Sequence, residues 1–335
     1  MIDRTVSVVI PCFNEAENIP NAHRRVGDVL RQVAARYEIV FVDNGSTDSS
    51  ARLLAEIAAG DDHVSVLSLS RNFGAQAAYS AGLDYASGDC AIIVDGDLQD
   101  PPELIPQMIA RWQEGYEVVY GRRTRRRAGI FVRAASSVFY RLFRNLAYVE
   151  MPVDAGEFGL MDRRVLDVLS AMPERNRFIR GLRAWAGFRQ TGVPYVRDPR
   201  TAGQSSNSIT DLFRWATTGL VSFSYAPLEW ISALAIFVTG MSAVAAVVYV
   251  GLYFAYPNAS RGFSTLVVLV LFLGGIQLLC LSIIGSYLAK IFEEIKARPK
   301  YIVDRVTNDH RDPSTEAALH RAAPARDGAR PDGGR

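Results

Sequence analysis

The sequence predicts an α/β domain built on a mostly parallel sheet, followed by two helices that cross a membrane. Two observations predict this fold class. Short runs rich in Val and Ile alternate with helical stretches in the first part of the chain, and two long apolar segments follow after residue 227. A third observation concerns function. Polar motifs begin where the predicted strands end, and functional residues of such sheets gather at the carboxyl ends of strands.

The alternating pattern lies within a predicted first domain, which we assign to residues 1–210. The predicted strands are residues 6–10, 38–42, 64–69, 90–94 and 117–120. The predicted helices are residues 16–36, 48–59, 75–86 and 102–114. Strands that alternate with helices in this way are typical of parallel sheets with helices on both faces.

Two basic segments, residues 131–148 and 177–189, also have helical spacing. In the second, apolar residues oppose arginines: Phe178, Ile179, Leu182, Trp185 and Phe188 against Arg177, Arg180 and Arg183. Basic amphipathic helices with aromatic residues fit a membrane interface, so we expect both segments to lie there. The alternative is a helix with its apolar face in the core and its basic face in solvent.

The membrane region is predicted over residues 211–300. Its two apolar segments, 228–254 and 263–289, each exceed the roughly 20 residues that cross a bilayer, and a short turn joins them into a hairpin. Basic residues flank the outer ends of the hairpin, so the positive-inside rule places the first domain and both termini in the cytoplasm. Small residues on the spans permit a homo-oligomer. The tail, 301–335, is expected to be disordered from about residue 308.

The strongest chemical signal is the motif DGDLQDPPE, which follows the fourth predicted strand. Its first two aspartates, Asp95 and Asp97, are one residue apart and can converge on one hard cation. Mg²⁺ or Mn²⁺ at this position would neutralise charge on a departing diphosphate. The third aspartate, Asp100, precedes two prolines, and we expect it to cap the following helix.

The other predicted strands also end in polar residues. Asn14 and Glu15 end the first strand, and Asp43 ends the second, where a carboxylate can accept hydrogen bonds from a base or a ribose. Arg71 follows the third strand and can meet a diphosphate. Taken singly, each is also explained as a loop residue, a helix cap or a solvated surface charge.

Together these motifs resemble the glycosyltransferase family 2 proteins with the GT-A fold. The match is closest to the polyprenyl-phosphate branch, which includes dolichol-phosphate mannose synthases and bacterial undecaprenyl-phosphate glucosyltransferases. The resemblance rests on PCFNE, VDNGSTD, SRNFGAQAAYSAG, DGDLQDPPE, the GRR at 121–123 and DAGEFGLMDRR, in this order, and on the paired spans. It covers roughly residues 5–305 and implies a GT-A catalytic domain.

The resemblance also implies roles for individual residues. The nucleotide-sugar site would include Pro11, Phe13, Asn14, Glu15, Asp43, Arg71, Asp95 and Gly96. The metal region would include Asp95, Asp97 and Gln99. Asp97, Glu157 and Asp154 would be catalytic, with Asp154 and Glu157 facing the acceptor.

The implied reaction is an inverting transfer of a hexose from a nucleotide-sugar, UDP-glucose favoured, to a polyprenyl phosphate at the cytoplasmic membrane face. The product would be a lipid-linked sugar for cell-surface glycan modification. A phosphate monoester is already anionic near neutral pH, so Asp154 or Glu157 need not act as a strong base. Arg122, Arg133 and Arg200 are expected to hold the acceptor phosphate, or else to form a basic face that attracts anionic membrane lipids.

Two departures from the family pattern bear on this interpretation. Asn44 stands where a second aspartate is usual, and the lysine and tyrosine often found after the arginine at position 200 are missing. The alternatives are a GDP-mannose-dependent mannosyltransferase, a glycan-extending synthase, which usually has more spans, and a catalytically silent sugar-nucleotide scaffold. Nucleic-acid binding by the arginines of 122–127 is disfavoured, because no aromatic residues are interleaved with these arginines.

Overall fold

The computed structural model describes residues 1–124, 155–175, 177–196, 224, 226–255 and 262–309. The chain divides into two compact units. One unit comprises residues 1–133, 151–206 and 297–335, and the other comprises residues 134–150 and 207–296. The predicted interfacial segment 131–148 and the predicted site residues Arg133, Asp154 and Arg200 lie outside the described residues.

The first unit contains one sheet, which has eight strands among the described residues. Their bounds are β1 Ile2–Cys12, β2 Ala34–Asp43, β3 Val64–Leu69, β4 Cys90–Ile93, β5 Val118–Arg123, β6 Ala155–Asp162, β7 Gln190–Tyr195 and β8 Val303–Thr307. The order across the sheet is β7-β5-β6-β4-β1-β2-β3-β8. The prediction of a mostly parallel α/β sheet is confirmed.

Strand direction decides which residues meet at one edge of this sheet. β1 pairs in parallel with β2 and β4, β2 with β3, and β5 with β7. β6 runs antiparallel to β4 and β5, with Gly159 opposite Ile93 and Ala155 opposite Arg122. The amino end of β6 therefore lies at the same edge as the carboxyl ends of β1 to β5.

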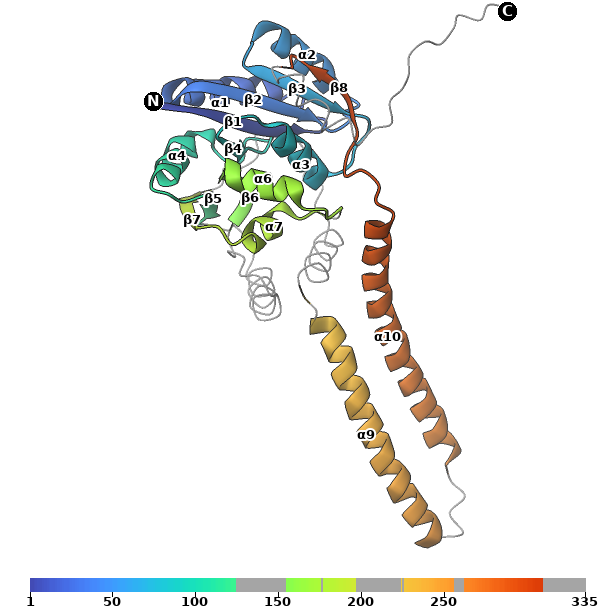
Figure 1. The fold of residues 1–335 in the computed structure, drawn as a ribbon. Helices are drawn as coiled ribbons and strands as arrows, with labels where there is room; N and C mark the ends of the chain where they lie inside the picture. The colour runs from blue at the N-terminus through green and yellow to red at the C-terminus, as the bar shows by residue number, and fades with distance from the viewer. Residues whose placement is uncertain (125–154, 176, 197–223, 225, 256–261, 310–335) are drawn as a thin grey trace, which may run out of the picture. The chain divides into compact units, whose positions relative to one another are not determined.

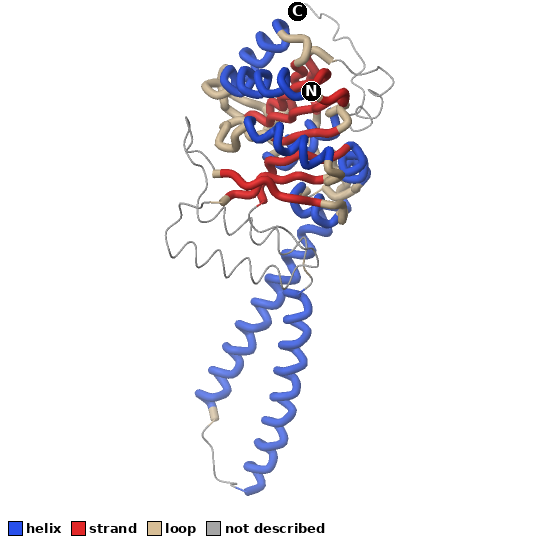
Figure 2. The backbone as a smooth tube through the Cα atoms, turned by 90° about the vertical axis from the view of Figure 1, so that its left-hand side faces the viewer, coloured by secondary structure: helices blue, strands red, loops and turns tan. Residues whose placement is uncertain are grey.

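Helices cover both faces of the sheet (Figure 2). They are α1 Ile19–Val33, α2 Ser50–Gly60, α3 Ala75–Tyr85, the short 3-10 helix Pro102–Leu104, α4 Ile105–Gln113, α6 Arg163–Ala171 and α7 Ile179–Trp185. Side chains alternate along a strand, so neighbouring residues serve opposite faces. Ile10 and Phe41 join the core beneath α1, whereas Val9 and Val42 lie against Gly82 of α3.

The first helix is shorter than predicted. The prediction was residues 16–36, but α1 ends at Val33 and Ala34 has an extended backbone. Ala34 pairs with Ile2 across the sheet, so residues 34–37 are used to lengthen β2. Pairing with a distant strand overrides the local helical pattern here.

The segment 177–189 differs from the predicted basic interfacial helix. Only Ile179–Trp185 is helical, and Ile179 and Leu182 are buried in the unit. Two arginines of the predicted basic face are buried as well: Arg177 is 6% exposed and Arg183 is 2% exposed. Neither the predicted basic face at a membrane interface nor the alternative of a basic face in solvent is right for these two side chains.

The second unit contains two long helices, α9 Ala226–Ala255 and α10 Phe263–Ile295. Both are long and apolar enough to cross a membrane, with apolar windows at Ala226–Ala245 and Phe272–Ile295. They coincide with the two predicted spans. Within this unit, the Tyr287 hydroxyl donates to the carbonyl of Ser224 over 2.7 Å.

The chain returns to the sheet after α10, which the sequence did not predict. β8 pairs antiparallel with β3, and Figure 1 shows the two strands side by side. The Tyr301 hydroxyl donates to Asp84 over 2.9 Å, and Lys300 donates to the carbonyl of Met172 over 3.0 Å. Residues 300–309 thus form part of the first unit rather than of a free tail.

Candidate active site

Three loops at the carboxyl edge of the sheet are joined by hydrogen bonds; we call them the β1–β3 loops (residues 11–18, 43–49 and 70–74). Asn14 has a left-handed backbone with φ of 55°, which asparagine tolerates well. Its side-chain oxygen accepts a hydrogen bond from Thr47 N over 2.8 Å, and its own backbone N–H donates to Ser46 over 3.0 Å. The Glu15 backbone N–H donates to Ser50 over 3.0 Å. Asn14 and Glu15 therefore position the first loop against the second.

Asp43 and Asn44 are both 4% exposed at the end of β2. Asp43 Oδ1 accepts from Ser46 N over 3.0 Å. The Asn44 amide donates to Asn72 Oδ1 over 3.2 Å and accepts from Phe73 N over 3.0 Å. An aspartate could not donate in this way. The departure at Asn44 therefore ties the second loop to the third.

Two glycines permit close approach of the loops. Gly45 has φ of 72°, and a Cβ there would lie 2.6 Å from the carbonyl carbon of Arg71. A Cβ on Gly96 would lie 2.9 Å from the carbonyl oxygen of Pro11. The loop after β4 thus packs directly on the loop after β1, which brings Gly96 beside Pro11 and Glu15.

The thiol of Cys12 is buried at the end of β1, next to the first of these loops. Burial raises the pKa of Cys12, and the charges of Glu15, Asp43 and Asp48 raise it further. Cys12 therefore stays a neutral thiol, surrounded by negative charge. Such a concentration of acidic groups suits a cation or the hydroxyl and amide donors of a ligand better than a bare anion.

The two aspartates of the predicted metal site follow β4. Asp95 Oδ1 accepts a hydrogen bond from the Tyr79 hydroxyl over 2.8 Å, and Asp97, which is 8% exposed, accepts from Gln99 N over 3.2 Å. Burial raises the pKa of Tyr79 well above its usual value, and the charges of Asp95 and Glu157 add to this effect. Tyr79 therefore remains a neutral donor that orients Asp95 without neutralising it.

Glu157 reaches the same region from β6. Its Oε1 accepts from Gln76 Nε2 over 3.1 Å, and the Gln76 carbonyl oxygen Oε1 accepts from Ile179 N over 2.8 Å. Gln76 and Tyr79 are three residues apart on α3 and so share one face of the helix. This face joins the loop after β4 to the start of β6. Neither residue was predicted, although their spacing in a helix that follows a strand end was a usable signal.

Asp100 does not cap a helix, contrary to the prediction. The residue that precedes the 3-10 helix is Pro101, and no side chain caps it. Asp100 is instead completely buried, accepts from the Tyr195 hydroxyl over 2.5 Å and lies 3.4 Å from the Arg123 guanidinium. Burial opposes the charge of Arg123, but Asp100 and Tyr195 outweigh it and raise the pKa of Arg123. Asp100 therefore joins β5 and β7 to the loop after β4.

Three further predicted site residues, Phe13, Arg71 and Arg122, lie near this edge of the sheet. Phe13 is 42% exposed. Arg71 is exposed and stacks on Phe73, with its guanidinium 4.0 Å from the ring centre. Arg122 is exposed near the end of β5, opposite Ala155 in the sheet. All three side chains are exposed at the surface, and Arg71 also donates to the carbonyl of Asn72 over 3.0 Å.

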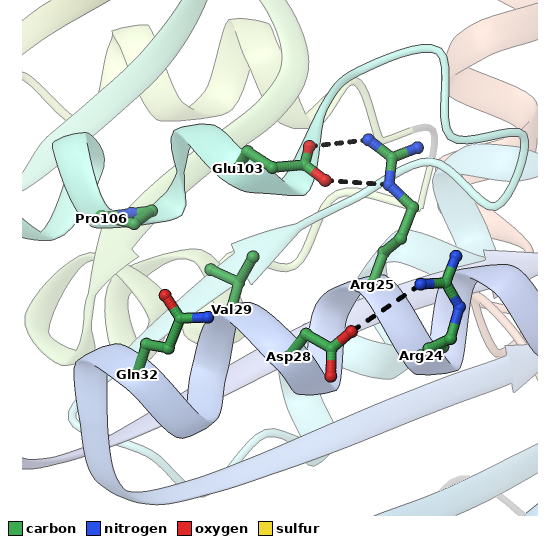
Figure 3. Close-up of a pocket in the computed structure, with 7 residues that line it drawn as sticks. All are labelled: Arg24, Arg25, Asp28, Val29, Gln32, Glu103 and Pro106. Carbon is green, nitrogen blue, oxygen red and sulfur yellow. Dashed lines mark hydrogen bonds and ion pairs between the residues drawn. The ribbon is translucent and has the colours of Figure 1, made fainter.

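A separate cavity of about 290 Å³ lies between α1 and the segment that begins α4 (Figure 3). Its lining residues are Arg24, Arg25, Asp28, Val29, Gln32, Glu103 and Pro106. Arg25 pairs with Glu103 through contacts of 2.9 and 2.7 Å. The cavity contains none of the predicted site residues, and its charges are matched within the protein.

Comparison with known proteins identifies the family. The model of glycosyl transferase family 2 matches residues 7–170. The glycosyltransferase YkcC of Bacillus subtilis is 40% identical over 89% of this chain and 93% of its own length. The bactoprenol glucosyl transferase of Shigella phage SfII is 37% identical over 90% of this chain and 97% of its own length.

Among solved structures, the mannosyltransferase PcManGT from Pyrobaculum calidifontis is 16% identical over 84% of this chain and 88% of that chain, with a TM-score of 0.42. The two sequence relatives cover about nine tenths of this chain. The protein is therefore a transferase enzyme that belongs to glycosyl transferase family 2.

Proposed function

We propose that the protein transfers a hexose, with glucose from UDP-glucose favoured, to a polyprenyl phosphate at a membrane surface. The observation that carries this proposal is that Asp95, Asp97 and Glu157 lie at one edge of the sheet, where Tyr79 and Gln76 of one helix face contact Asp95 and Glu157. Relatives named bactoprenol glucosyl transferases at 37% identity support the lipid acceptor and the sugar. The two helices long enough to cross a membrane support the location.

We propose that a divalent cation, Mg²⁺ or Mn²⁺, binds at Asp95 and Asp97, with Gln99 beside it. Neutral donors orient one oxygen of each carboxylate, which leaves their charge intact. No group of three or more His, Cys, Asp or Glu in the described part of the chain could hold a metal by itself. A site with only the two carboxylates of Asp95 and Asp97 suits an ion that takes its other ligands from a diphosphate and water. When bound, the ion would stabilise charge on the leaving nucleotide.

The chain's own residues then have separate tasks in this proposal. Asp43 and the first loop bind the nucleotide, and Arg71 reaches its diphosphate from the third loop. Glu157 faces the reacting centre and accepts a hydrogen bond from a substrate hydroxyl. The anionic acceptor phosphate attacks the anomeric carbon as the bond to the nucleotide diphosphate breaks, which inverts the configuration. Arg122, together with Arg133 and Arg200, holds the acceptor phosphate.

The membrane arrangement belongs to the same proposal. Residues 1–210 would form the cytoplasmic catalytic domain, and 211–300 the membrane region, with both termini cytoplasmic. A lipid acceptor keeps its tail in the bilayer, so anchoring the enzyme there raises the effective concentration of the phosphate. The charge flanking the two helices supports this orientation.

The test uses the full chain in lipid nanodiscs that contain undecaprenyl phosphate and Mg²⁺. Radiolabelled UDP-glucose, UDP-galactose, UDP-N-acetylglucosamine and GDP-mannose are supplied separately, and the labelled lipid product is measured. We expect label from UDP-glucose that depends on both lipid phosphate and metal. Label from GDP-mannose alone would replace the sugar assignment, and no lipid product from any donor would overturn the proposal.

A substitution distinguishes the metal site from a merely acidic loop. Asp97→Asn should reduce transfer at least about 100-fold, because it removes one of two charges that hold the cation. Asp62→Asn is the matched control, since Asp62 is exposed and lies before β3 at the opposite edge of the sheet. Equal activity of the two variants would contradict the metal assignment.

A further inference from the structure

Gln76 is a partly buried amide in the first turn of α3, and it contacts two other elements at once. Its side-chain oxygen Oε1 accepts a hydrogen bond from Ile179 N over 2.8 Å, and its Nε2 donates to Glu157 Oε1 over 3.1 Å. A backbone N–H can only donate, so the amide oxygen must face Ile179. The NH₂ group is therefore turned toward Glu157, and the orientation of the amide is fixed by its contacts.

The contact with Ile179 holds the tip of the Gln76 side chain at the start of α7. Phe178, the residue that precedes this helix, makes no side-chain cap hydrogen bond. The first N–H groups of a helix have no partner within the helix, so the Gln76 oxygen satisfies one of them from another element. Ile179 is 1% exposed. The amide is thus bound to the backbone of a buried residue.

The helix α3 gives Gln76 a firm base. Gly82 of this helix lies so close to the sheet that a Cβ there would overlap Val9 Cγ1 and would lie 3.0 Å from Val42 Cγ2. The Ser80 hydroxyl is buried and donates to the backbone carbonyl of Gln76 over 2.8 Å. A side chain held at both its base and its tip has few alternative positions, so it can fix the orientation of a neighbouring carboxylate.

The orientation of Glu157 depends on this contact. In the part of the chain that the structure describes, Oε1 accepts from Gln76, whereas Oε2 is buried without a hydrogen-bond partner. An unpaired buried acceptor is unusual in a folded protein, and a substrate hydroxyl would supply the missing donor. Loss of the Gln76 amide would leave both oxygens of Glu157 without a partner, and the carboxylate could then turn away from its position.

We propose that Gln76 is a positioning residue for sugar transfer, which holds the Glu157 carboxylate where its second oxygen accepts from a substrate hydroxyl. This inference rests on the proposed function, in which Glu157 faces the reacting centre. Gln76 acts through Glu157 and does not itself touch the substrate. Loss of its amide should therefore slow the transfer step and leave the binding of nucleotide-sugar and cation in place.

Tyr79 provides a comparison on the same face of α3. Its hydroxyl donates to Asp95 Oδ1 over 2.8 Å, whereas Gln76 donates to Glu157. Asp95 belongs to the proposed metal site, so loss of the Tyr79 hydroxyl should weaken the binding of the cation rather than slow the step that depends on Glu157. The two side chains are three residues apart on one helix, yet they should affect different kinetic quantities.

The measurement is the steady-state kinetics of the full chain in nanodiscs with undecaprenyl phosphate, UDP-glucose and a series of Mg²⁺ concentrations. Gln76→Leu and Gln76→Glu should each lower kcat at least about tenfold, with less than about a twofold change in the KM for UDP-glucose and in the half-saturating Mg²⁺ concentration. Gln76→Glu keeps an acceptor for Ile179 N but turns a carboxylate oxygen toward Glu157. A loss of kcat in this variant is therefore not explained by loosening of α7.

Tyr79→Phe should show the reverse pattern. The half-saturating Mg²⁺ concentration should rise at least about threefold, while kcat at saturating Mg²⁺ should fall less than about threefold. Ser80→Ala is the matched control, because it removes a buried hydroxyl of α3 whose hydrogen bond lies within the helix. It should leave all three quantities within about twofold of the wild type.

Two outcomes would overturn this proposal alone. One is a kcat within about twofold of the wild type in both Gln76 variants. The other is a rise in KM and in the Mg²⁺ requirement as large as the loss of kcat, since that would indicate a general disturbance of α3. If the wild type makes no lipid-linked product from any nucleotide-sugar, the proposed function fails, and the role of Gln76 fails with it.

Discussion

The β1–β3 loops and the region of β5 to β7 with α7 stabilise their polar groups in different ways. In the loops, Asn14, Asp43 and Asn44 are satisfied by backbone N–H groups, hydroxyls and amides at about 3 Å. In the β5–β7 region, charged groups are buried against one another, as at Asp100 with Arg123. There, Glu157 and Arg183 keep polar atoms without partners in the described residues.

This difference indicates how rigidity is divided across the site. Loops held by neutral hydrogen bonds are positioned before any ligand arrives, so the nucleotide that we propose for this site would bind them without reorganisation. In a region with unmatched buried charge, the free energy changes strongly when a neighbouring charge is added or removed. Mutations should therefore have local, modest effects in the loops and larger effects in the β5–β7 region.

The largest effect on stability is expected from Asp100→Ala. The substitution removes the acceptor of the Tyr195 hydroxyl and the opposite charge of Arg123, at a position with no solvent exposure. Breaking a buried pair from one side typically costs about 3–5 kcal/mol. The free energy of unfolding of the full chain in detergent, measured by urea denaturation with tryptophan fluorescence, checks this.

Tyr195→Phe is the control for that variant, because it removes a single hydroxyl and leaves the charges in place. Its expected cost is about 1–3 kcal/mol. A loss below about 1 kcal/mol in Asp100→Ala would mean that the buried cluster contributes no more than a surface pair, and the contrast between the two regions would fail.

Gly45→Ala should have the next largest effect. The glycine has φ of 72°, and a Cβ would lie 2.6 Å from the Arg71 carbonyl carbon and 2.8 Å from Asn72 N. Backbone strain of this kind costs on the order of 1–3 kcal/mol. If the chain moved to relieve this strain, the second loop would separate from the third. We expect weaker binding of nucleotide-sugar, measured by isothermal titration calorimetry, together with the loss of stability.

Gly60→Ala is the matched control for the glycine substitution. Gly60 ends α2, and a Cβ there would meet no atom within 4 Å. Reduced freedom of the unfolded chain should make this variant neutral or up to about 1 kcal/mol more stable. Equal nucleotide affinity in the two variants would show that the close approach at Gly45 does not position the loops.

Much of the β1–β4 half of the fold was predictable because its signals are local. Short Val- and Ile-rich strands end in polar residues, and parallel pairing then brings those ends to one edge, as observed for Asp43 and Asp95. The family pattern predicted Glu157 as an acceptor-facing residue, but not its contact with Gln76. That contact depends on β6 running antiparallel to β4, which nothing in the local sequence specifies.

The incorrect predictions share one cause, which is contact between residues that are far apart in the sequence. Asp100 resembled a helix cap, since its neighbours are prolines, but its partner Tyr195 is 95 residues away. Arg177 and Arg183 resembled the basic face of an interfacial helix, because helical spacing alone does not tell which face meets the sheet. β8 escaped prediction for a similar reason: its five residues form a strand by pairing with β3, more than 200 residues earlier in the chain.

Asn44→Asp tests whether the departure from the usual pair of aspartates is structural. The carboxylate could still accept from Phe73 N but could not donate to Asn72, and it would add a charge next to buried Asp43. We expect a loss of about 1–2 kcal/mol, measured by urea denaturation. In a double-mutant cycle with Asn72→Ala, much of this loss should disappear. A fully additive cycle would contradict the proposed tie between the two loops.

The smallest effect is expected from Arg25→Ala, at the cavity between α1 and α4. Arg25 contacts Glu103 at 2.7 Å, a shorter contact than the 3.4 Å between Arg123 and Asp100, but the Glu103 side chain is 54% exposed whereas that of Asp100 is 0% exposed. Burial alone would raise the pKa of Glu103, but hydrogen bonds from Arg25 outweigh it and lower that pKa. Solvent screening should limit the contribution of the pair to about 1 kcal/mol or less.

The sign of the pH dependence follows from that lowered pKa. A carboxyl group whose pKa is lower in the folded state contributes stability at neutral pH and loses it as the pH falls through its folded pKa. The difference in unfolding free energy between the wild type and Arg25→Ala should therefore shrink in acid, and also in 1 M salt, where the Debye length is about 3 Å. Transfer activity should be unchanged. A cost as large as that of Asp100→Ala would show that contact distance outweighs burial, which would reverse the explanation given for the two regions.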